Sequence, residues 1–178
     1  RLSSSCRSAM RFSTTFQDQA KMLQQVIDGL ATLDVRAVVT LGGAIRPDEV
    51  RGAANVHIVE SAPHAELMQE ASLVISHGGH GTVLKAAIAG LPQLIVPHGR
   101  DQHDNAMRIA TRGAGLTLDR TADATTVRTA AQRLLTEADF AKNAHALGER
   151  IRASYTEDDI VHAVEGLAAA DAGNERAA

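Results

Sequence analysis

The sequence predicts an α/β fold, with a Rossmann-like, mostly parallel sheet covered by helices on both faces. Short apolar runs alternate with helix-period segments along the chain, which is the pattern of successive βα units. The 178 residues suit one domain with a sizeable core. A glycine-rich turn joins one apolar run to a helix-period segment, and in such folds ligands bind at the carboxyl ends of the strands.

Apolar spacing identifies the first elements. Thr14 or Thr15 is positioned to cap a helix whose apolar residues fall on one face, namely Leu23, Val26, Ile27 and Leu30. Strands are predicted over residues 35–41, 55–60, 72–76 and 93–96, and a short helix over residues 65–70. A last short strand is predicted over residues 115–118. Right-handed crossovers would join these strands into one sheet.

Three more helices are predicted towards the end of the chain. Their apolar faces are Val127, Ala130, Ala131 and Leu134, then Phe140, Ala144, Leu147 and Ile151, and finally Ile160, Val161, Val164 and Leu167. Serine-rich residues 1–10 are interpreted as a linker or an added segment, although residues 9–13 can form a first edge strand. Residues 11–170 form the predicted domain, and residues 171–178 a frayed tail.

Composition excludes several classes of protein. A net charge of -3, from 18 basic and 21 acidic side chains, offers no basic surface for nucleic acid. The single Cys6 has no partner for an internal disulfide, and no apolar run approaches the roughly 18 to 20 residues that span a membrane. We therefore expect a cytoplasmic protein without membrane contact. Aromatic residues make up only 2% of the chain, so we expect an aliphatic, alanine-rich core.

The glycine-rich turn predicts an anion site. It runs through His77, Gly78, Gly79, His80 and Gly81, directly after the apolar strand over residues 72–76, and a helix-period segment begins at Thr82. Glycines let the backbone approach a ligand closely, and the N-terminus of the following helix presents unpaired N–H groups and the positive end of its dipole. Phosphate or pyrophosphate is the predicted occupant.

Two other functions of this region, a dinucleotide site and a zinc site, are disfavoured by the sequence. A dinucleotide site requires the spacing G-x-G-x-x-G, which the turn does not have. Zinc is disfavoured because no cysteine and no H-E-x-x-H helix accompany the histidines, which are His64, His77, His80, His98 and His103. We expect His103 at the surface, and His80 and His98 either lining the cleft or structural.

The motifs identify a family resemblance. The segment HGGHGT, followed by GLPQLIVPHGRDQHDNA, closely resembles the donor-binding signature of GT-B glycosyltransferases, above all bacterial enzymes that glycosylate macrolides and other polyketides. Residues 13–19, STTFQDQ, and residues 61–68, SAPHAELM, extend the resemblance to about residues 11–165. It implies one half of a GT-B fold, the C-terminal nucleotide-sugar-binding domain. The family's N-terminal domain, which binds the acceptor and supplies the catalytic histidine, has no counterpart in this sequence.

The resemblance also implies roles for individual residues. His77 would stabilise the leaving diphosphate, with Gly79, Gly81 and Thr82 cradling it. Asp101 and Gln102 match the pair that binds the donor sugar, and the alternative for Asp101 is that it only caps the following helix. Six further positions are candidates for lining the nucleotide cleft, namely Ser13, Thr14, Ser61, Ala62, His80 and His98.

Lys85 departs from the family pattern. It occupies the position at which uridine-using plant enzymes carry a glutamate that accepts hydrogen bonds from both ribose hydroxyls. An ammonium group accepts none, so the substitution favours a donor without a 2′-hydroxyl, which indicates a dTDP-sugar rather than a UDP-sugar. The alternative is that Lys85 merely points into solvent.

The implied activity is inverting transfer of a sugar or deoxysugar to a hydroxyl of a small natural product, with no metal cofactor. Because the acceptor domain and its base are not in this sequence, we expect no catalytic residue in this chain and no activity from it alone. The alternative function is a non-catalytic nucleotide-sugar-binding module, or a subunit completed by a partner chain. The apolar face of residues 160–167 makes self-association an expected outcome.

Overall fold

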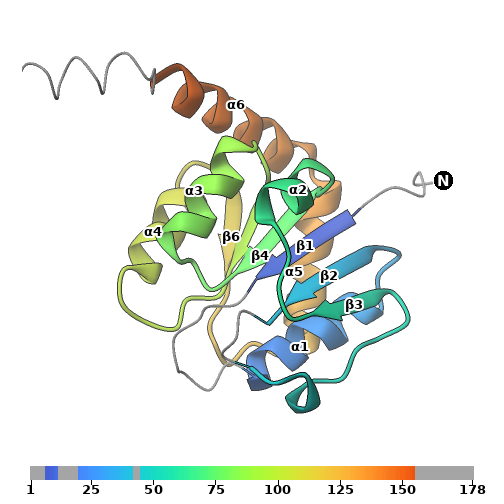
Figure 1. The fold of residues 1–178 in the computed structure, drawn as a ribbon. Helices are drawn as coiled ribbons and strands as arrows, with labels where there is room; N and C mark the ends of the chain where they lie inside the picture. Colours follow the sequence, from blue (N-terminus) through green and yellow to red (C-terminus); the bar gives the residue numbers. More distant parts are fainter. Residues whose placement is uncertain (1–6, 12–19, 42–44, 155–178) are drawn as a thin grey trace, which may run out of the picture.

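The computed structural model describes residues 7–11, 20–41 and 45–154, which form an α/β fold around one parallel sheet (Figure 1). Its strands are β1 (Arg7–Arg11), β2 (Arg36–Thr40), β3 (Val56–Val59), β4 (Leu73–Ser76), β5 (Gln93–Ile95) and β6 (Gly115–Thr117). They lie in the order β3-β2-β1-β4-β5-β6, and every neighbouring pair is parallel. The predicted sheet is confirmed, and five strands fall where the apolar runs placed them.

Strand β1 corrects two predictions. It lies in the middle of the sheet, not at an edge, because it pairs with β2 on one side and with β4 on the other. Arg7–Met10 therefore belong to the sheet, although residues 1–10 were interpreted as a linker. The segment RSAMR has only two apolar residues, so hydrophobic patterning missed it. The chain turns towards β2 on one side of β1 and returns to β4 on the other, which creates a switch point between β1 and β4.

Helices cover both faces of the sheet, as predicted. They are α1 (Ala20–Ala31), α2 (His64–Gln69), α3 (His80–Ile88), α4 (Gln102–Ala110), α5 (Ala124–Thr136) and α6 (Ala138–Ser154), with a 3₁₀ turn at Pro47–Glu49 that was not predicted. Helix α3 begins two residues before the expected Thr82, because Gly79 takes the N-cap position. The proposed caps Thr14 and Thr15, the face of residues 160–167 and the tail lie outside the described residues.

The core is aliphatic on both faces of the sheet. On one face α1 and α5 pack against each other and against side chains such as Val39, Ile75 and Leu94. On the other face, α3, α4 and α6 pack over Ile95 of β5, and Val83 of α3 belongs to the same apolar cluster. Phe140 is partly buried at the margin of the first cluster, and no aromatic side chain belongs to the buried core of the described residues. The alanine-rich, aliphatic core was therefore predicted correctly.

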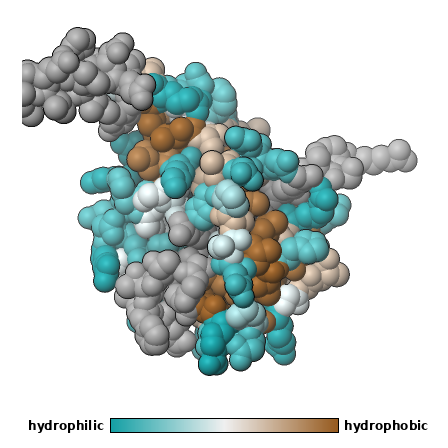
Figure 2. Space-filling view, viewed as in Figure 1, coloured by the Kyte–Doolittle hydropathy of each residue, from teal (hydrophilic) through white to brown (hydrophobic). Residues whose placement is uncertain are grey.

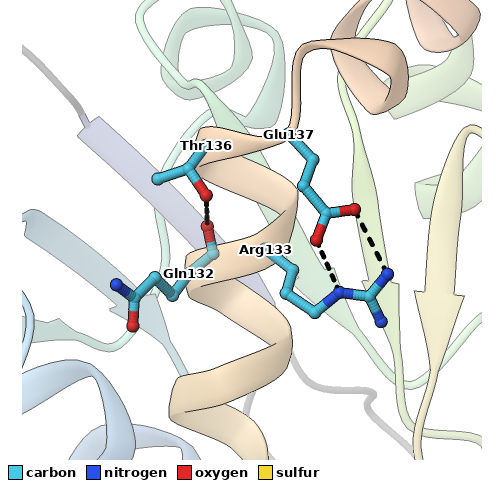
Figure 3. Close-up of polar contacts among 4 residues, drawn as sticks. All are labelled: Gln132, Arg133, Thr136 and Glu137. Atoms are coloured by element: carbon cyan, nitrogen blue, oxygen red, sulfur yellow. Dashed lines mark hydrogen bonds and ion pairs between the residues drawn. The ribbon is translucent and has the colours of Figure 1, made fainter.

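The junction between α5 and α6 is held by local polar contacts (Figure 3). Arg133 donates to both carboxylate oxygens of Glu137, at 2.7 and 3.2 Å, and its guanidinium carbon lies 5.8 Å from the centre of the Phe140 ring. Thr136 Oγ1 donates to the Gln132 carbonyl at 2.8 Å. The hydrogen bonds from Arg133, and its charge, lower the pKa of the Glu137 carboxyl below its ordinary value. The pair is exposed, so it orients the chain more than it stabilises the fold.

Apolar surface is visible where α3 lies beside α6 (Figure 2). Leu84 and Ile88, one turn apart on α3, are 37% and 38% exposed, and Met107 on α4 is 56% exposed. Within the described ranges, no helix combines the length and apolarity needed to cross a membrane. The predicted cytoplasmic location and self-association stay predictions.

Candidate functional site

The turn after β4 is the centre of the site. His77 follows the strand directly and is only 5% exposed. Gly78 adopts a φ of 90°, and a Cβ there would lie 2.8 Å from Ile95 Cγ2. Its N–H donates to Ser76 Oγ at 3.2 Å. Only glycine meets both the backbone and the space requirement of this position, so the sharp turn depends on it.

The His77 imidazole lies against the next glycine. A Cβ added to Gly79 would be 2.5 Å from His77 Nε2, so a side chain at residue 79 would displace the ring. Gly79 is also the N-cap of α3. The small residue therefore sets the imidazole beside the positive end of the helix, where both can face the same negative charge.

The first turn of α3 offers N–H groups to an anion. The N–H groups of Thr82 and Val83 both donate to the Gly79 carbonyl at 3.0 Å. Those of His80 and Gly81, at the two positions before them, have no intrahelical partner by the geometry of a helix start. A Cβ on Gly81 would meet no atom of the described residues within 4 Å. A phosphate can approach closely there, whereas the buried Thr82 has only its hydroxyl left for a ligand.

The start of α4 carries the pair predicted to bind a sugar. Asp101 is exposed at the N-cap position but makes no side-chain cap, so capping is not its role here. Its Oδ2 accepts a hydrogen bond from Asn105 Nδ2 at 2.9 Å. Gln102 is 8% exposed, and its Oε1 accepts from the N–H groups of His98 and Gly99 at 2.7 and 3.2 Å. Its carbonyl is thus occupied, and its amide N–H₂ is the group that can contact a ligand.

The two turns form one site. Asn105 Nδ2 also donates to the Gly78 carbonyl at 3.0 Å, and a Cβ on Gly78 would lie 3.1 Å from the backbone carbonyl oxygen of Gln102. The turn after β4, the turn after β5 and the start of α4 are therefore in direct contact. This brings His77, Gly79, Asp101 and Gln102 together at the carboxyl edge of the sheet.

The other predicted positions lie around this centre or outside the structure. Ser61 and Ala62 follow β3 at the beginning of the crossover to α2, exposed and half-buried respectively. Lys85 is exposed on α3, and His80 is exposed in the first turn of the same helix. His103 lies on the exposed face of α4, as expected. Ser13 and Thr14 lie outside the described residues.

His98 lies on the border between the site and an open pocket of about 720 Å³. The pocket extends to Lys21 and Gln25 of α1 and to Arg120 and Asp123 ahead of α5. His77 and Asp101 are not among the residues that line it, so we place the anion site at the glycine-rich turn, where the backbone N–H groups are. Within the described part of the chain, no three histidine, cysteine or acidic side chains are grouped to hold a metal. The metal-free expectation stays a prediction.

The pKa of His98 is lowered from its ordinary value of 6.5, chiefly because the ring is buried. The nearby charge of Arg120 lowers it further, whereas the hydrogen bond between Nδ1 and the Val96 carbonyl, at 2.9 Å, acts in the opposite direction. A histidine whose folded pKa is depressed contributes stability that is present above about pH 6.5 and is lost as the pH falls towards the folded pKa.

His98→Asn, which keeps a donor to the Val96 carbonyl, removes this titration. The free energy of unfolding of the variant is therefore expected to fall less than that of wild type between about pH 7.5 and 5.5. Urea unfolding at both pH values measures this, with His103→Asn as the control. An equal fall in His98→Asn and wild type would contradict it.

Comparison with known proteins identifies the family. Residues 24–167 match the model of the erythromycin biosynthesis protein CIII-like, C-terminal domain. The chain belongs to this family. Among curated relatives, the elloramycin glycosyltransferase ElmGT of Streptomyces olivaceus is 38% identical over 129 residues, covering 71% of this chain and 32% of the relative. The tylactone mycaminosyltransferase of Streptomyces fradiae is 31% identical over 160 residues, covering 87% of this chain and 34% of the relative. The chain thus spans about a third of their length.

Solved structures agree with the family. The spinosyn forosaminyltransferase SpnP has a TM-score of 0.78 at 36% identity, over 89% of this chain and 43% of that one. The glycosyltransferase VinC, solved in complex with dTDP, has a TM-score of 0.71 at 25% identity, over 81% of this chain and 37% of that one. The fold is therefore that of the C-terminal domain of GT-B glycosyltransferases that modify natural products.

Sequence reasoning missed two polar residues that hold the site together, Ser76 and Asn105, and one contact of the predicted Gln102. Ser76 and Asn105 both bond to the backbone of Gly78, and the Gln102 carbonyl holds the turn at His98. A signal for Asn105 was available, because it shares the inner face of its predicted helix with Ala106 and Ile109. A polar side chain on a buried helix face requires a hydrogen-bonding partner.

Proposed function

We propose that this chain is the nucleotide-sugar-binding domain of an inverting glycosyltransferase that uses a dTDP-linked deoxysugar. The observation that carries the proposal is the direct contact between the turn at His77 and the start of α4. It places an anion-binding helix N-terminus beside a carboxylate and an amide that can bind sugar hydroxyls. The family membership supports the reaction class, since the relatives named above are glycosyltransferases.

In the proposed reaction, an acceptor hydroxyl oxygen bonds to the anomeric carbon while the bond from that carbon to the diphosphate breaks. The acceptor proton passes to a base, and the electron pair of the broken bond leaves on the diphosphate oxygen. His77 and the first N–H groups of α3 stabilise the charge that builds there. Asp101 accepts from a sugar hydroxyl, and the Gln102 amide donates to a sugar oxygen. We place the base and the acceptor site on a part of the enzyme outside this chain.

The preference for dTDP is proposed from Lys85. It lies on α3 one turn after the anion-binding N-terminus, and its ammonium group accepts no hydrogen bond from a ribose 2′-hydroxyl. The likeness to VinC, solved with dTDP, supports the same choice. A deoxyribonucleotide lacks that hydroxyl, so at this position it loses only the acceptor for its 3′-hydroxyl, whereas a ribonucleotide loses the acceptor for both.

Calorimetric titration of the chain with dTDP and with UDP tests the donor site. We expect dTDP to bind more tightly, and Lys85→Glu to improve UDP binding relative to dTDP, because a carboxylate accepts from both ribose hydroxyls. Lys85→Ala is the matched control, since it removes the charge without adding an acceptor. It should leave the preference nearer to that of wild type than Lys85→Glu does.

Two outcomes count against the proposal. No heat with either nucleotide at millimolar concentration would overturn the donor site itself. An unchanged preference in Lys85→Glu would overturn only the assignment of Lys85 to the ribose. The expected inactivity of the chain alone is measured separately, by assaying release of dTDP from a dTDP-sugar in the presence of an alcohol acceptor.

A further inference from the structure

The inner face of α4 buries two polar side chains where apolar ones would suit the core. Gln102 and Asn105 are 8% and 5% exposed, and the same face carries Ala106 and Ile109. Asparagine is a weaker helix former than alanine or leucine, and a buried amide is tolerated only when it is hydrogen-bonded. The use of an amide at position 105 therefore lies in the hydrogen bonds that it makes.

Asn105 uses one nitrogen to join two parts of the site. Nδ2 donates to the Gly78 carbonyl at 3.0 Å and to Asp101 Oδ2 at 2.9 Å. An amide nitrogen carries two protons, so both are used. One bond reaches the turn that offers N–H groups to a diphosphate, and the other holds the carboxylate that would bind a sugar.

The bond to Gly78 also fixes the direction of a neighbouring donor. The Gly78 carbonyl and the Gly79 N–H belong to one peptide unit, and the described residues contain no cis peptide bond. In a planar trans peptide the C=O and N–H groups point in opposite directions. Because the carbonyl points at Asn105 on α4, the Gly79 N–H points away from α4. It is thereby aimed as a donor on the side of the turn that faces away from the helix.

We propose that Asn105 is a positioning residue that couples the diphosphate and sugar parts of the donor site. Its amide turns the Gly79 N–H towards the diphosphate and at the same time holds Asp101 so that Oδ1 faces the sugar. This inference rests on the proposed function. It adds a residue that touches neither substrate part and yet sets the geometry of both.

Calorimetric titration of the full chain with dTDP and with dTDP-glucose tests the coupling. Asn105→Ala is expected to weaken dTDP binding about tenfold, through loss of one backbone bond in the turn, and dTDP-glucose binding by a larger factor. Asn105→Asp keeps the shape but replaces both donor protons by a carboxylate that faces Asp101 and the Gly78 carbonyl. It should weaken both ligands at least as much. Asp104→Ala, on the exposed side of the same helix, is the control and should bind like wild type.

A measurement on the wild-type chain removes any dependence on how the variants fold. The amide proton resonance of Gly79 is expected to shift when dTDP is added, because its N–H donates to the diphosphate. A Gly79 resonance that does not move, or wild-type affinity of both Asn105 variants for both ligands, would overturn the inference. Absence of binding by the wild-type chain would instead overturn the proposed function, so the two failures are distinguishable.

Discussion

Gly78→Ala is expected to lower the free energy of unfolding by about 3 kcal/mol, the sum of backbone strain at positive φ and a steric overlap. The φ of 90° disfavours any residue with a side chain. The new Cβ would also lie 2.8 Å from Ile95 Cγ2 and 3.1 Å from the backbone carbonyl oxygen of Gln102. Relief of this overlap moves the turn away from α4, so nucleotide binding is lost together with stability. Urea unfolding and calorimetric titration with dTDP measure the two effects.

Gly81→Ala is the matched comparison. Gly81 is the second residue of α3, and apart from the helix's own backbone a Cβ there meets none of the described atoms within 4 Å. In a helix interior alanine is favoured over glycine by about 0.5 to 1 kcal/mol, so at this first-turn position the variant should be at least as stable as wild type. If a diphosphate lies against Gly81, however, the added methyl group weakens dTDP binding. A variant that is at least as stable as wild type and unchanged in dTDP affinity would place the diphosphate elsewhere.

His77→Ala is expected to weaken dTDP binding roughly 10- to 100-fold, since a hydrogen bond to a charged group contributes about 1.5 to 3 kcal/mol. Truncation of a buried ring also leaves a cavity, so His77→Phe is the better test, because it keeps most of the volume and has no N–H group. Calorimetric titration with dTDP measures both variants.

The control for this prediction is His103→Ala, which removes an imidazole from the exposed face of α4. It should leave dTDP affinity unchanged. His80→Ala is informative in its own right, because His80 is exposed in the first turn of α3 and was a candidate for the cleft. Wild-type affinity of His77→Phe would show that the diphosphate does not contact this imidazole.

Much of the fold was predictable because hydrophobic spacing reports burial. The runs that became β4 and β5 are buried at every residue, since central parallel strands in this fold are covered on both faces. The glycine-rich turn was predictable because several glycines between a strand and a helix are typical of a turn that binds an anion at the helix N-terminus. The family signature then assigned His77, Asp101 and Gln102 to a common site, and the structure brings them together.

Other features do not appear in local patterns. Strand β1 has little apolar periodicity, and its central place follows from backbone pairing with two strands that are distant in sequence. Residues 78 and 105 are 27 positions apart, so no local rule predicts the bond between them. Gln102 was predicted to bind the sugar, but only its contact with the turn at His98 shows that its carbonyl is already occupied.

The sequence by itself determined the class of fold and the edge of the sheet that carries the candidate site, because these depend on spacing within one or two elements. Only the tertiary structure decided how the site is held. One amide nitrogen of Asn105 donates to the Gly78 carbonyl and to Asp101, and so joins the turn after β4 to the start of α4. Hydrogen bonds between elements depend on how helices and strands pack, and packing is set by the whole chain.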